Sequence, residues 1–384
     1  MAPMISVSEA TSIFKEKLLI KSIKIAHSVF ADRDYPPFNR VMMDGIAISY
    51  QDYEEGHREF SIAGIQPAGV EALGPISSNQ CIEVMTGAPL PKGADLVIPY
   101  EDLKISEKSA QIINETSRSK MEHVHLQGSD CKAGDKVLNA GTNLNGPHTG
   151  IATSMGMLPE LTESSRILVI STGDELVEVH EKPLEYQIRR SNVHAIKNSL
   201  ELNGFTDVSI NHLKDDKELV AAHFIHATKL FDVLIYSGGV SKGKFDFLPS
   251  VWSEQGVIKY FHEVAQRPGK PLWFGKDELN QTTVIGLPGN PISSLICLHR
   301  YFIPTRLMYA LLEDEITFSK PLTYFLPSTF SYKTDGTLWA KPLKIKNSGE
   351  FTALANSDGF LELPAEMNHF PKGHAFPFWP WKGL

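Results

Sequence analysis

The chain has 384 residues, of which 42% are hydrophobic and 21% charged, and its formal net charge is -8. This length exceeds one ordinary hydrophobic core and predicts two to four domains. The acidic balance argues against a general nucleic-acid surface, and we expect no nucleic-acid partner. We find no signal core and no apolar stretch long enough to span a bilayer, so we expect a cytoplasmic protein without membrane contact. Three widely spaced cysteines exclude a disulfide framework and a zinc site: Cys81, Cys131 and Cys297.

The first part of the chain is predicted to contain a helix and then a β-rich domain. Apolar residues at helical spacing predict a helix within residues 6–29. Gly and Pro are frequent from 60 to 99, between short β-prone runs such as 82–85, which predicts a small β domain. His123 and His125 fall two apart in a predicted strand. Because no third ligand is near in sequence, we interpret them as a solvated face and not as metal ligands.

The second part predicts alternating strands and helices. A helix at 147–157 is expected to pack beside the N-terminal helix and form a discontinuous linking domain. From Arg166 onward, βαβ alternation predicts a doubly wound domain. Beyond Pro304 the helical pattern fades and short β-prone runs predict a small β domain. The predicted strands are 167–170, 208–212, 231–236, 272–274, 283–286, 338–340 and 359–363, and the predicted helices are 192–203, 218–228 and one from about 292.

A polar loop follows the first of these strands, where open α/β sheets bind their ligands. Asp174 and Glu175 lie in this loop and are candidates for Mg²⁺ binding or proton transfer. An exposed acidic turn explains them equally well. The chain has no Walker loop, Gly-x-Ser-x-Gly elbow or dinucleotide glycine motif, which argues against a nucleotide hydrolase, a serine esterase and a Rossmann dehydrogenase.

A second loop, after the strand at 231–236, has the residue types that bind phosphate. Gly238 and Gly239 allow the backbone to approach a ligand closely. The next residues add a hydroxyl, two ammonium groups and a carboxylate just before a predicted helix, which suits phosphate or Mg²⁺-phosphate. These residues are Ser241, Lys242, Lys244 and Asp246.

Two Pro-Gly turns complete the candidate site. Arg267-Pro268-Gly269-Lys270-Pro271 precedes one predicted strand, and Leu287-Pro288-Gly289-Asn290-Pro291 follows the next. A single Pro-Gly pair often does no more than turn the chain. The two turns together with the Gly-Gly loop favour an anion-binding active site.

Six motifs, in this order and spacing, resemble the molybdopterin molybdenumtransferase family, which includes the E domain of gephyrin. The resemblance covers nearly the whole chain. The motifs are Met43-Asp44-Gly45, Met85-Thr86-Gly87-Ala88-Pro89, Ser171-Thr172-Gly173-Asp174-Glu175-Leu176, Ser237-Gly238-Gly239-Val240-Ser241 with Asp246, and the two Pro-Gly turns.

The resemblance implies a multidomain α/β plus β architecture and an elongated homodimer whose active sites combine both protomers. It implies a linking domain, a β-rich domain, a molybdopterin-binding-like doubly wound α/β domain and a small C-terminal β-barrel-like domain. In this sequence the four domains are expected at 1–37 with 128–165, at 38–127, at 166–306 and at 307–384.

The resemblance also implies a reaction, in which adenylylated molybdopterin and molybdate give molybdenum cofactor and AMP with Mg²⁺. A transient contact with the molybdopterin adenylyltransferase is expected. The implied catalytic residues are Asp44, Thr86, Asp130, Glu175, Asp215 and Asp246, and the implied metal ligands are Asp246, Asp174 and Glu175. The expected substrate-binding residues are Gly238, Gly239, Ser241, Arg267, Lys270, Pro288, Pro291, Lys341 and Ser348, with Lys344 and Lys346 as further basic residues.

Three positions depart from the family's pattern. Glu263 stands where a basic residue is usual before the Pro-Gly-Lys-Pro turn, which reverses the charge. His125 and Lys341 stand where arginines are usual. Glu263 and His125 keep open the alternative of a non-catalytic dimeric scaffold. A second alternative is an adenylyl-transferring or pyrophosphate-cleaving enzyme acting on a related pterin, because the α/β domain resembles the family that adenylylates molybdopterin.

Overall fold

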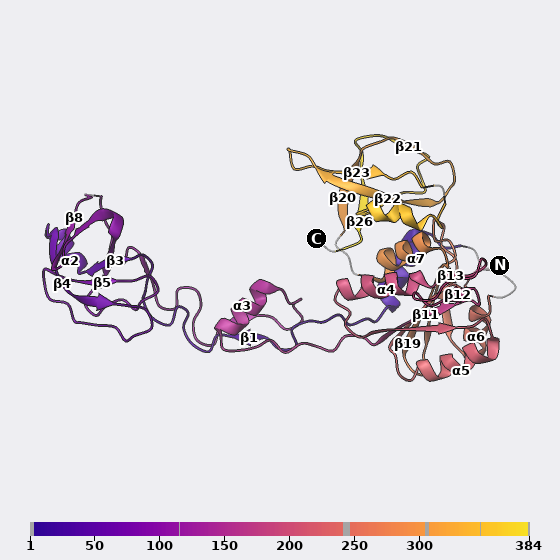
Figure 1. Cartoon of the computed structure of the whole chain (residues 1–384), viewed down its shortest axis with the longest axis horizontal. Helices are drawn as coiled ribbons and strands as arrows, with labels where there is room; N and C mark the ends of the chain where they lie inside the picture. The colour runs from indigo at the N-terminus through magenta and orange to yellow at the C-terminus, as the bar shows by residue number, and fades with distance from the viewer. Residues whose placement is uncertain (1–3, 115, 241–245, 304–306, 346, 383–384) are drawn as a thin grey trace. The chain divides into compact units, whose positions relative to one another are not determined.

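The computed structural model describes residues 4–114, 116–240, 246–303, 307–345 and 347–382. Ser241, Lys242, Lys244 and Lys346 therefore lie outside the described residues. Contacts divide the chain into two compact units, Met1–Ile23 with Glu163–Leu384, and Lys24–Thr162, and each is described by itself (Figure 1). The three cysteines are free, as predicted. Among the described helices we find none with the length and apolar character needed to cross a membrane.

The α/β part of the first unit is built on a six-stranded sheet in the order β14-β11-β15-β19-β18-β16. The first four strands are parallel, and β18 is antiparallel to both of its neighbours. All six residues of β11 are buried, because Ile167 and Val169 enter one core while Leu168 and Ile170 enter the other. The strands are β11 (Ile167–Thr172), β14 (Val208–Leu213), β15 (Val233–Ser237), β16 (Ile258–Phe261), β18 (Trp273–Asp277) and β19 (Thr282–Leu287).

Helices cover both faces of this sheet, which confirms the doubly wound prediction (Figure 1). The core on one face takes residues from α1, α4 and α7. The core on the other face takes residues from α5 and α6. The helices are α1 (Val7–Lys17), α4 (Ser191–Leu202), α5 (Lys217–Ala227), α6 (Leu248–Glu254) and α7 (Pro291–Cys297), which continues as a π-helical turn, η2 (Leu298–Phe302).

The N-terminal helix differs from its prediction in length and in packing. α1 begins with a capping box between Ser6 and Glu9 and ends at Lys17, well before residue 29. The Phe14 ring stacks on Phe274 with 4.1 Å between ring centroids, so α1 belongs to the α/β unit. The prediction that it packs beside the helix near 147–157 was wrong. That helix, α3 (Gly146–Ser154), contributes to a separate core in the second unit.

The second unit contains the predicted β-rich domain, a six-stranded sheet in the order β6-β3-β5-β4-β8-β7. Two short antiparallel pairs, β1 with β10 and β2 with β9, lie outside this sheet. The strands are β1 (Val29–Phe30), β2 (Arg40–Val41), β3 (Gly45–Ile48), β4 (Glu59–Gln66), β5 (Gln80–Val84), β6 (Leu96–Pro99), β7 (Leu103–Ile105), β8 (Ser109–Ile112), β9 (Val124–His125) and β10 (Lys136–Leu138), with helices α2 (Tyr50–Glu54) and η1 (Tyr100–Asp102).

The C-terminal strands form a closed barrel, as expected. β22, β23, β20, β26 and β24 pair in that order, and β22 also pairs with β24, which closes the ring. β17 adds to β22 and brings the first Pro-Gly turn against the barrel. The elements are β17 (Gln266–Arg267), β20 (Met308–Leu312), β21 (Ile316–Thr317), β22 (Thr323–Tyr332), β23 (Leu338–Pro342), η3 (Phe351–Asn356), β24 (Gly359–Leu363), β25 (His369–Phe370) and β26 (Ala375–Pro380).

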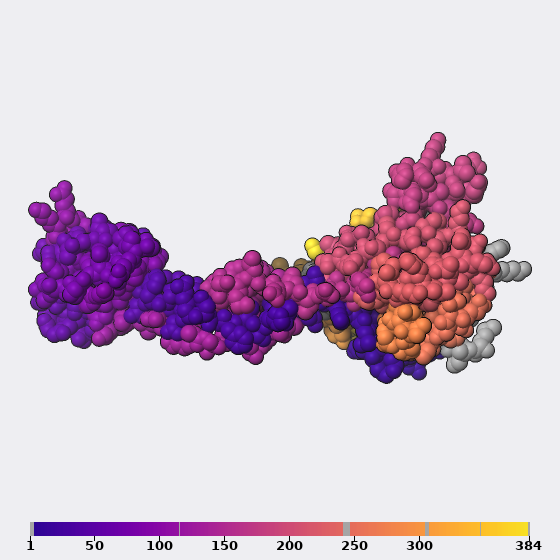
Figure 2. Space-filling model, turned by 90° about the horizontal axis from the view of Figure 1, so that it is seen from below, coloured from indigo at the N-terminus to yellow at the C-terminus, as the bar shows by residue number. Residues whose placement is uncertain are grey.

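The loop after β11 contains a small two-stranded pair, β12 (Leu176–Val177) with β13 (Ile188–Arg189). The chain between them exposes apolar side chains, with Leu184 and Tyr186 at 55% and 74% exposure. In the space-filling view, a projection from the α/β part carries the pink of this segment (Figure 2). The acidic residues Asp174 and Glu175 lie at the base of this loop.

Candidate active site

The carboxyl ends of the parallel strands bring the predicted acidic residues together. Asp174 and Glu175 follow β11, and Asp215 follows β14, its immediate neighbour in the sheet. The backbone N–H of Asp215 donates to Asp174 Oδ1 over 3.4 Å. Burial raises the pKa of Asp215, and the charges of Asp174, Glu175 and Asp246 raise it further. Asp174, Glu175, Asp215 and Asp246 therefore form one acidic group, in which the charges of the other three carboxylates act on Asp215.

This acidic group has the chemistry that suits Mg²⁺. Carboxylate oxygens are ligands that Mg²⁺ prefers, and a divalent cation would relieve the repulsion that raises the pKa of Asp215. The acidic group is not a closed cage. Its carboxylates, which all belong to described residues, do not place three ligand atoms within 4.8 Å of one another. Among the described residues, such a trio is formed by Asp52, Glu55 and His57, which lie in the second unit. This arrangement suits Mg²⁺, which commonly binds to one or two carboxylates and completes its coordination with substrate phosphates.

The Gly238-Gly239 loop lies against the end of β11. Both glycines have positive φ, 103° and 68°. A Cβ on Gly239 would lie 2.9 Å from Thr172 Oγ1 and 2.8 Å from Leu248, so the backbone passes too close to its neighbours for a side chain. The Thr172 hydroxyl is buried without a hydrogen-bond partner among the described residues. The loop thus brings backbone without side chains close to the end of β11, and the Gly238 N–H is used in a bond to the Leu287 carbonyl.

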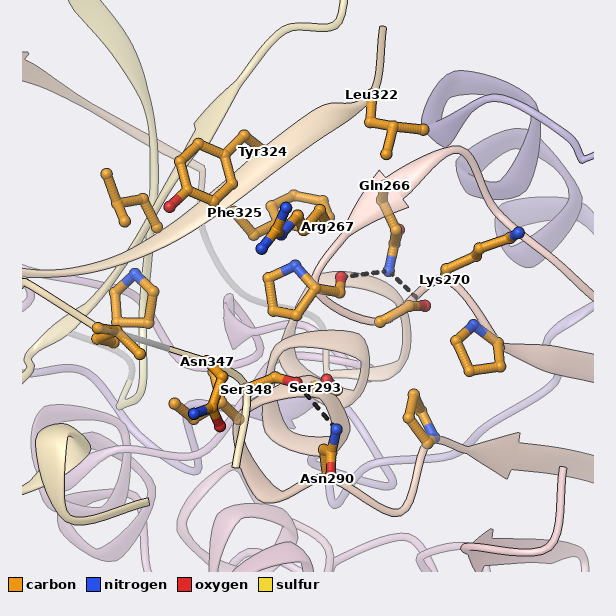
Figure 3. Close-up of a pocket in the computed structure, with 18 of the residues that line it drawn as sticks. Gln266, Arg267, Lys270, Asn290, Ser293, Leu322, Tyr324, Phe325, Asn347 and Ser348 are labelled. Atoms are coloured by element: carbon orange, nitrogen blue, oxygen red, sulfur yellow. Dashed lines mark hydrogen bonds between the residues drawn. The ribbon is translucent and has the colours of Figure 1, made fainter. Parts of the chain in front are cut away.

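A pocket of about 650 Å³ lies between the α/β part and the barrel. Figure 3 shows Arg267 and Lys270 from the first Pro-Gly turn, with Asn290 and Ser348 across the pocket. Of the predicted substrate-binding residues, Arg267, Lys270, Pro288 and Ser348 line it. Pro291 begins α7 next to it, and Lys341 lies exposed on β23 and is not among the described lining residues.

Buried contacts fix the shape of the first Pro-Gly turn. Gln266 is 1% exposed, and its Nε2 donates to the Gly269 carbonyl over 3.0 Å. The Tyr301 hydroxyl donates to Gln266 Oε1 from the π-helical turn. Gly269 has φ +91°, and a Cβ there would lie 2.6 Å from Cys297 Sγ. The buried side chains of Gln266, Tyr301 and Cys297 therefore fix the conformation of the turn that carries Arg267 and Lys270.

The pocket continues toward the Gly238-Gly239 loop. Gly289 lines the pocket, and a Cβ on it would lie 3.7 Å from the Gly238 Cα. Asn192, at the start of α4, ties the two loops together. Its Nδ2 donates to Ser237 Oγ over 3.0 Å and to the Gly289 carbonyl over 2.7 Å. The sequence analysis missed Asn192, since its only signal was its place at the start of a predicted helix.

Glu263 pairs with a cation of the pocket. Its Oε1 lies 3.8 Å from Lys270 Nζ, and its side chain is 16% exposed. The Glu263 carbonyl accepts from the Ile5 N–H, which anchors α1 at this place. The departure from the family's pattern thus places a carboxylate beside Lys270 and offsets part of its charge.

In the second unit, Asp44 and Thr86 are in direct contact. The Thr86 N–H donates to Asp44 Oδ1 over 2.6 Å. This hydrogen bond lowers the pKa of Asp44 and keeps it ionised. Asp130 lies in the same unit and contacts His125. His123 and His125, interpreted as a solvated face, are only partly exposed, and His125 has polar partners on both ring nitrogens.

Comparison with known proteins matches nearly the whole chain. The MoeA N-terminal region (domain I and II) matches residues 5–156, a probable molybdopterin binding domain matches 168–307, and the MoeA C-terminal region (domain IV) matches 309–381. The crystal structure of the molybdopterin biosynthesis MoeA protein from Pyrococcus horikoshii has the same fold, with a TM-score of 0.75 at 24% identity over 100% of both chains.

Several relatives bear the name molybdopterin molybdenumtransferase. The protein of Synechocystis sp. is 51% identical over 358 residues, which are 93% of this chain and 92% of the relative. The protein of Haemophilus influenzae is 29% identical over 377 residues, which are 94% of this chain and 91% of the relative. The chain therefore belongs to the molybdopterin molybdenumtransferase family.

Proposed function

We propose that this protein inserts molybdate into adenylylated molybdopterin and releases AMP. The observation that carries the proposal is a series of neighbouring loops in the first unit. It runs from the cationic turn with Arg267 and Lys270, past Pro288 and Gly289, to the Gly238-Gly239 loop and the acidic group. Two substrates, molybdate at the cationic turn and the pyrophosphate of adenylylated molybdopterin at the glycine loop, fit this order of groups.

Different residues of these loops would bind molybdate, the phosphates and Mg²⁺. Lys270 and Arg267 offer charged donors to a compact dianion, and Ser348 offers a hydroxyl. The Gly238 N–H already donates to the Leu287 carbonyl over 3.1 Å, so the Gly239 N–H is the backbone donor that the glycine loop would offer to the phosphates. Asp246, Asp174 and Glu175 would hold Mg²⁺, which when bound neutralises charge on the pyrophosphate. The Asp215 N–H donates to Asp174, which places the Asp215 carboxylate beside the proposed metal ligands, where it can take up a proton.

Insertion and cleavage are balanced separately. In insertion, two Mo–S bonds form to the two thiol sulfurs of the pterin, and one molybdate oxygen leaves as water with the two thiol protons. Cleavage of the pyrophosphate link consumes one water. Its oxygen joins the adenylyl phosphorus, the P–O bond to the pterin phosphate breaks, and AMP leaves. The phosphate stays on the pterin, and the attacking water gives up both of its protons as two phosphate monoester dianions form, the first proton as its oxygen bonds to phosphorus. A carboxylate near the phosphates, of which Asp215 is our candidate, takes up this proton.

The proposal includes a homodimer in which Asp44, Thr86 and Asp130 of one protomer complete the site of the other. It also includes a cytoplasmic location, in keeping with three free cysteines. A transient contact with the adenylyltransferase would pass on the substrate without exposing its anhydride to water. Size-exclusion chromatography with light scattering tests the dimer, and a mixed dimer of Asp44→Asn and Asp246→Asn protomers tests whether two inactive chains share one intact site.

Turnover of adenylylated molybdopterin tests the catalytic assignment. Asp246→Asn should abolish Mg²⁺-dependent AMP release while the protein stays folded and keeps its oligomeric state. Asp314→Asn, at an exposed position of the barrel domain, is the matched control and should behave as the wild type. Wild-type rates in Asp246→Asn would remove Asp246 from the metal site, and equal loss in both variants would make the effect nonspecific.

A further inference from the structure

Three polar side chains from three segments of the second unit form a chain of hydrogen bonds. Arg40 on β2 lies opposite His125 on β9 in the antiparallel pair. Arg40 Nη2 is 3.1 Å from His125 Nδ1. His125 Nε2 is 2.8 Å from Asp130 Oδ1. Both ring nitrogens of His125 are therefore engaged, one by a cation and the other by a carboxylate.

The partners define the tautomer of the His125 ring. A guanidinium has five donors and no acceptor, so the nitrogen that faces Arg40 must accept. His125 Nδ1 then bears the lone pair, and Nε2 bears the proton that is donated to Asp130. A hydrogen bond from a cation polarises the ring and strengthens the donor on its far side. Arg40 thus acts on Asp130 through His125.

The Asp130 carboxylate is held at one oxygen only. Oδ1 accepts from His125 and, over 3.4 Å, from Ser129 Oγ. Oδ2 has no hydrogen-bond partner among the residues that the structure describes. The backbone of Asp130 is fixed by its N–H, which donates to the Tyr35 carbonyl over 3.0 Å. With 48% of its side chain exposed, Asp130 can offer Oδ2 to a ligand.

The chain of hydrogen bonds also connects to Asp44 and Thr86. β2 ends at Val41, two residues short of Met43-Asp44, and Val41 exchanges backbone hydrogen bonds with Gly87 and Ala88, both 2.9 Å long. The segment from Arg40 to Asp44 thus lies between the Thr86 turn and the β9 strand. All three proposed catalytic residues of this unit are anchored to that one segment.

We propose that Arg40 and His125 are positioning residues that fix the ionised carboxylate of Asp130 for the reaction. This inference rests on the proposed function for its catalytic part. Arg40 supplies the positive charge, and the neutral His125 ring transmits it to Asp130 by a directed N–H bond. In this way Arg40 and His125 together do what a single arginine at position 125 would do by direct contact.

Imidazole ¹⁵N NMR of the full chain tests the hydrogen-bond chain without relying on activity. The His125 signals, assigned by their loss in His125→Gln, should show Nδ1 unprotonated and Nε2 protonated in the wild type. Arg40→Met replaces the guanidinium by an apolar side chain of similar length. His125 Nδ1 then loses its donor, and its ¹⁵N chemical shift should change. Arg33→Met, at an exposed position of the same unit, is the control and should leave the His125 signals unchanged. A protonated Nδ1 in the wild type, or no change in Arg40→Met, would overturn the proposal.

Kinetics of AMP release test the positioning role. Arg40→Met should lower kcat on the order of 10-fold with little change in KM, because a misplaced group costs rate and not substrate binding. Arg40→Met with His125→Arg should recover most of the lost rate, since the new guanidinium reaches Asp130 directly. Loss without such recovery would reduce Arg40 to a structural contact. Absence of AMP release in the wild type would defeat the proposed function, while the NMR result would still decide on the hydrogen-bond chain.

Discussion

Glu263 Oε1 lies 3.8 Å from Lys270 Nζ, so a carboxylate stands beside a cation of the proposed molybdate pocket. Lys270 is half exposed and Glu263 largely buried. The fixed negative charge therefore competes with an incoming dianion for the same ammonium group. We therefore expect Glu263 to lower the affinity of the pocket for anions.

Replacing Glu263 by Gln should tighten anion binding. Removing the charge is worth about 1 kcal/mol at this partly exposed site, or roughly fivefold in Kd. Calorimetric titration with molybdate measures it directly. Glu315→Gln, at an exposed position of the barrel domain, is the matched control and should bind molybdate like the wild type. Unchanged or weaker binding in Glu263→Gln would place Glu263 outside the anion's field.

Asp215→Asn should stabilise the metal-free protein at neutral pH. The folded-state pKa of Asp215 is raised by burial and by Asp174, Glu175 and Asp246, so its ionised form opposes folding. This opposition is present above the raised folded pKa and disappears as the pH falls below the unfolded value. The variant should therefore melt above the wild type at pH 7, and the difference should vanish near pH 4.

Addition of Mg²⁺ provides the second half of this test. The wild type should gain thermal stability with Mg²⁺, because the cation relieves the repulsion among the carboxylates. Asp215→Asn should gain less, since part of the repulsion is already absent. Asp314→Asn should respond to Mg²⁺ as the wild type does. Equal Mg²⁺ shifts in Asp215→Asn and the wild type would contradict the placement of Asp215 beside the metal site.

Gly269→Ala should destabilise the protein more than Gly336→Ala. Both glycines have positive φ, +91° and +82°, so both substitutions carry backbone strain of about 1 kcal/mol. At Gly269 the new methyl would also lie 2.6 Å from Cys297 Sγ and 2.7 Å from Gln266 Nε2, whereas Gly336 has open space. Urea unfolding should show an additional loss of about 1–3 kcal/mol at Gly269. Equal losses would mean that the turn can move to admit a methyl group.

His299 should make the first unit sensitive to acid. Its ring is fully buried beside Trp381 and bonded to Ser199 Oγ, and burial lowers its pKa to about 4. In the unfolded chain the pKa of this histidine is about 6.5. Between pH 6.5 and 4 the unfolded chain is protonated at His299 and the folded chain is not, so the free energy of unfolding falls as the pH falls. The loss reaches about 3 kcal/mol at pH 4.

Melting temperatures across pH 4–7 check this expectation. His299→Gln should show a shallower fall than the wild type, although it is less stable at pH 7. His374→Gln, a change at an exposed histidine of the barrel domain, should follow the wild-type curve. Parallel curves for His299→Gln and the wild type would show that His299 is not the acid-sensitive group.

The sequence indicated the loops of the site because their chemistry is local. Glycine pairs, Pro-Gly turns and carboxylates at strand ends can be identified without knowing how strands pair, and parallel pairing then brings Asp174 and Asp215 together. The four parallel strands of the α/β sheet were found for the same reason, since buried parallel strands are continuous apolar runs, whereas the edge strand β16 was not predicted. Closure of the barrel also agrees with the expected domain type.

Residues that act through distant packing were not predictable in this way. Asn192 joins two loops by contacts that span 45 and 97 residues of sequence. The docking of α1 depends on Phe14 meeting Phe274, which no local pattern reveals. His125 looked like a solvated residue because Arg40, its partner, is 85 residues away. Lys341, which the resemblance gave as the counterpart of a family arginine, is exposed on β23 and is not among the described residues that line the pocket.

The most direct test of the account is the stoichiometry of a single turnover. Purified wild-type protein would be given adenylylated molybdopterin and Mg²⁺ with or without molybdate, and AMP and pterin-bound molybdenum would be quantified together. We expect one AMP released for each molybdenum bound to pterin, and little AMP when molybdate is omitted. AMP release that is independent of molybdate, or that leaves no molybdenum on the pterin, would contradict insertion and indicate pyrophosphate cleavage alone.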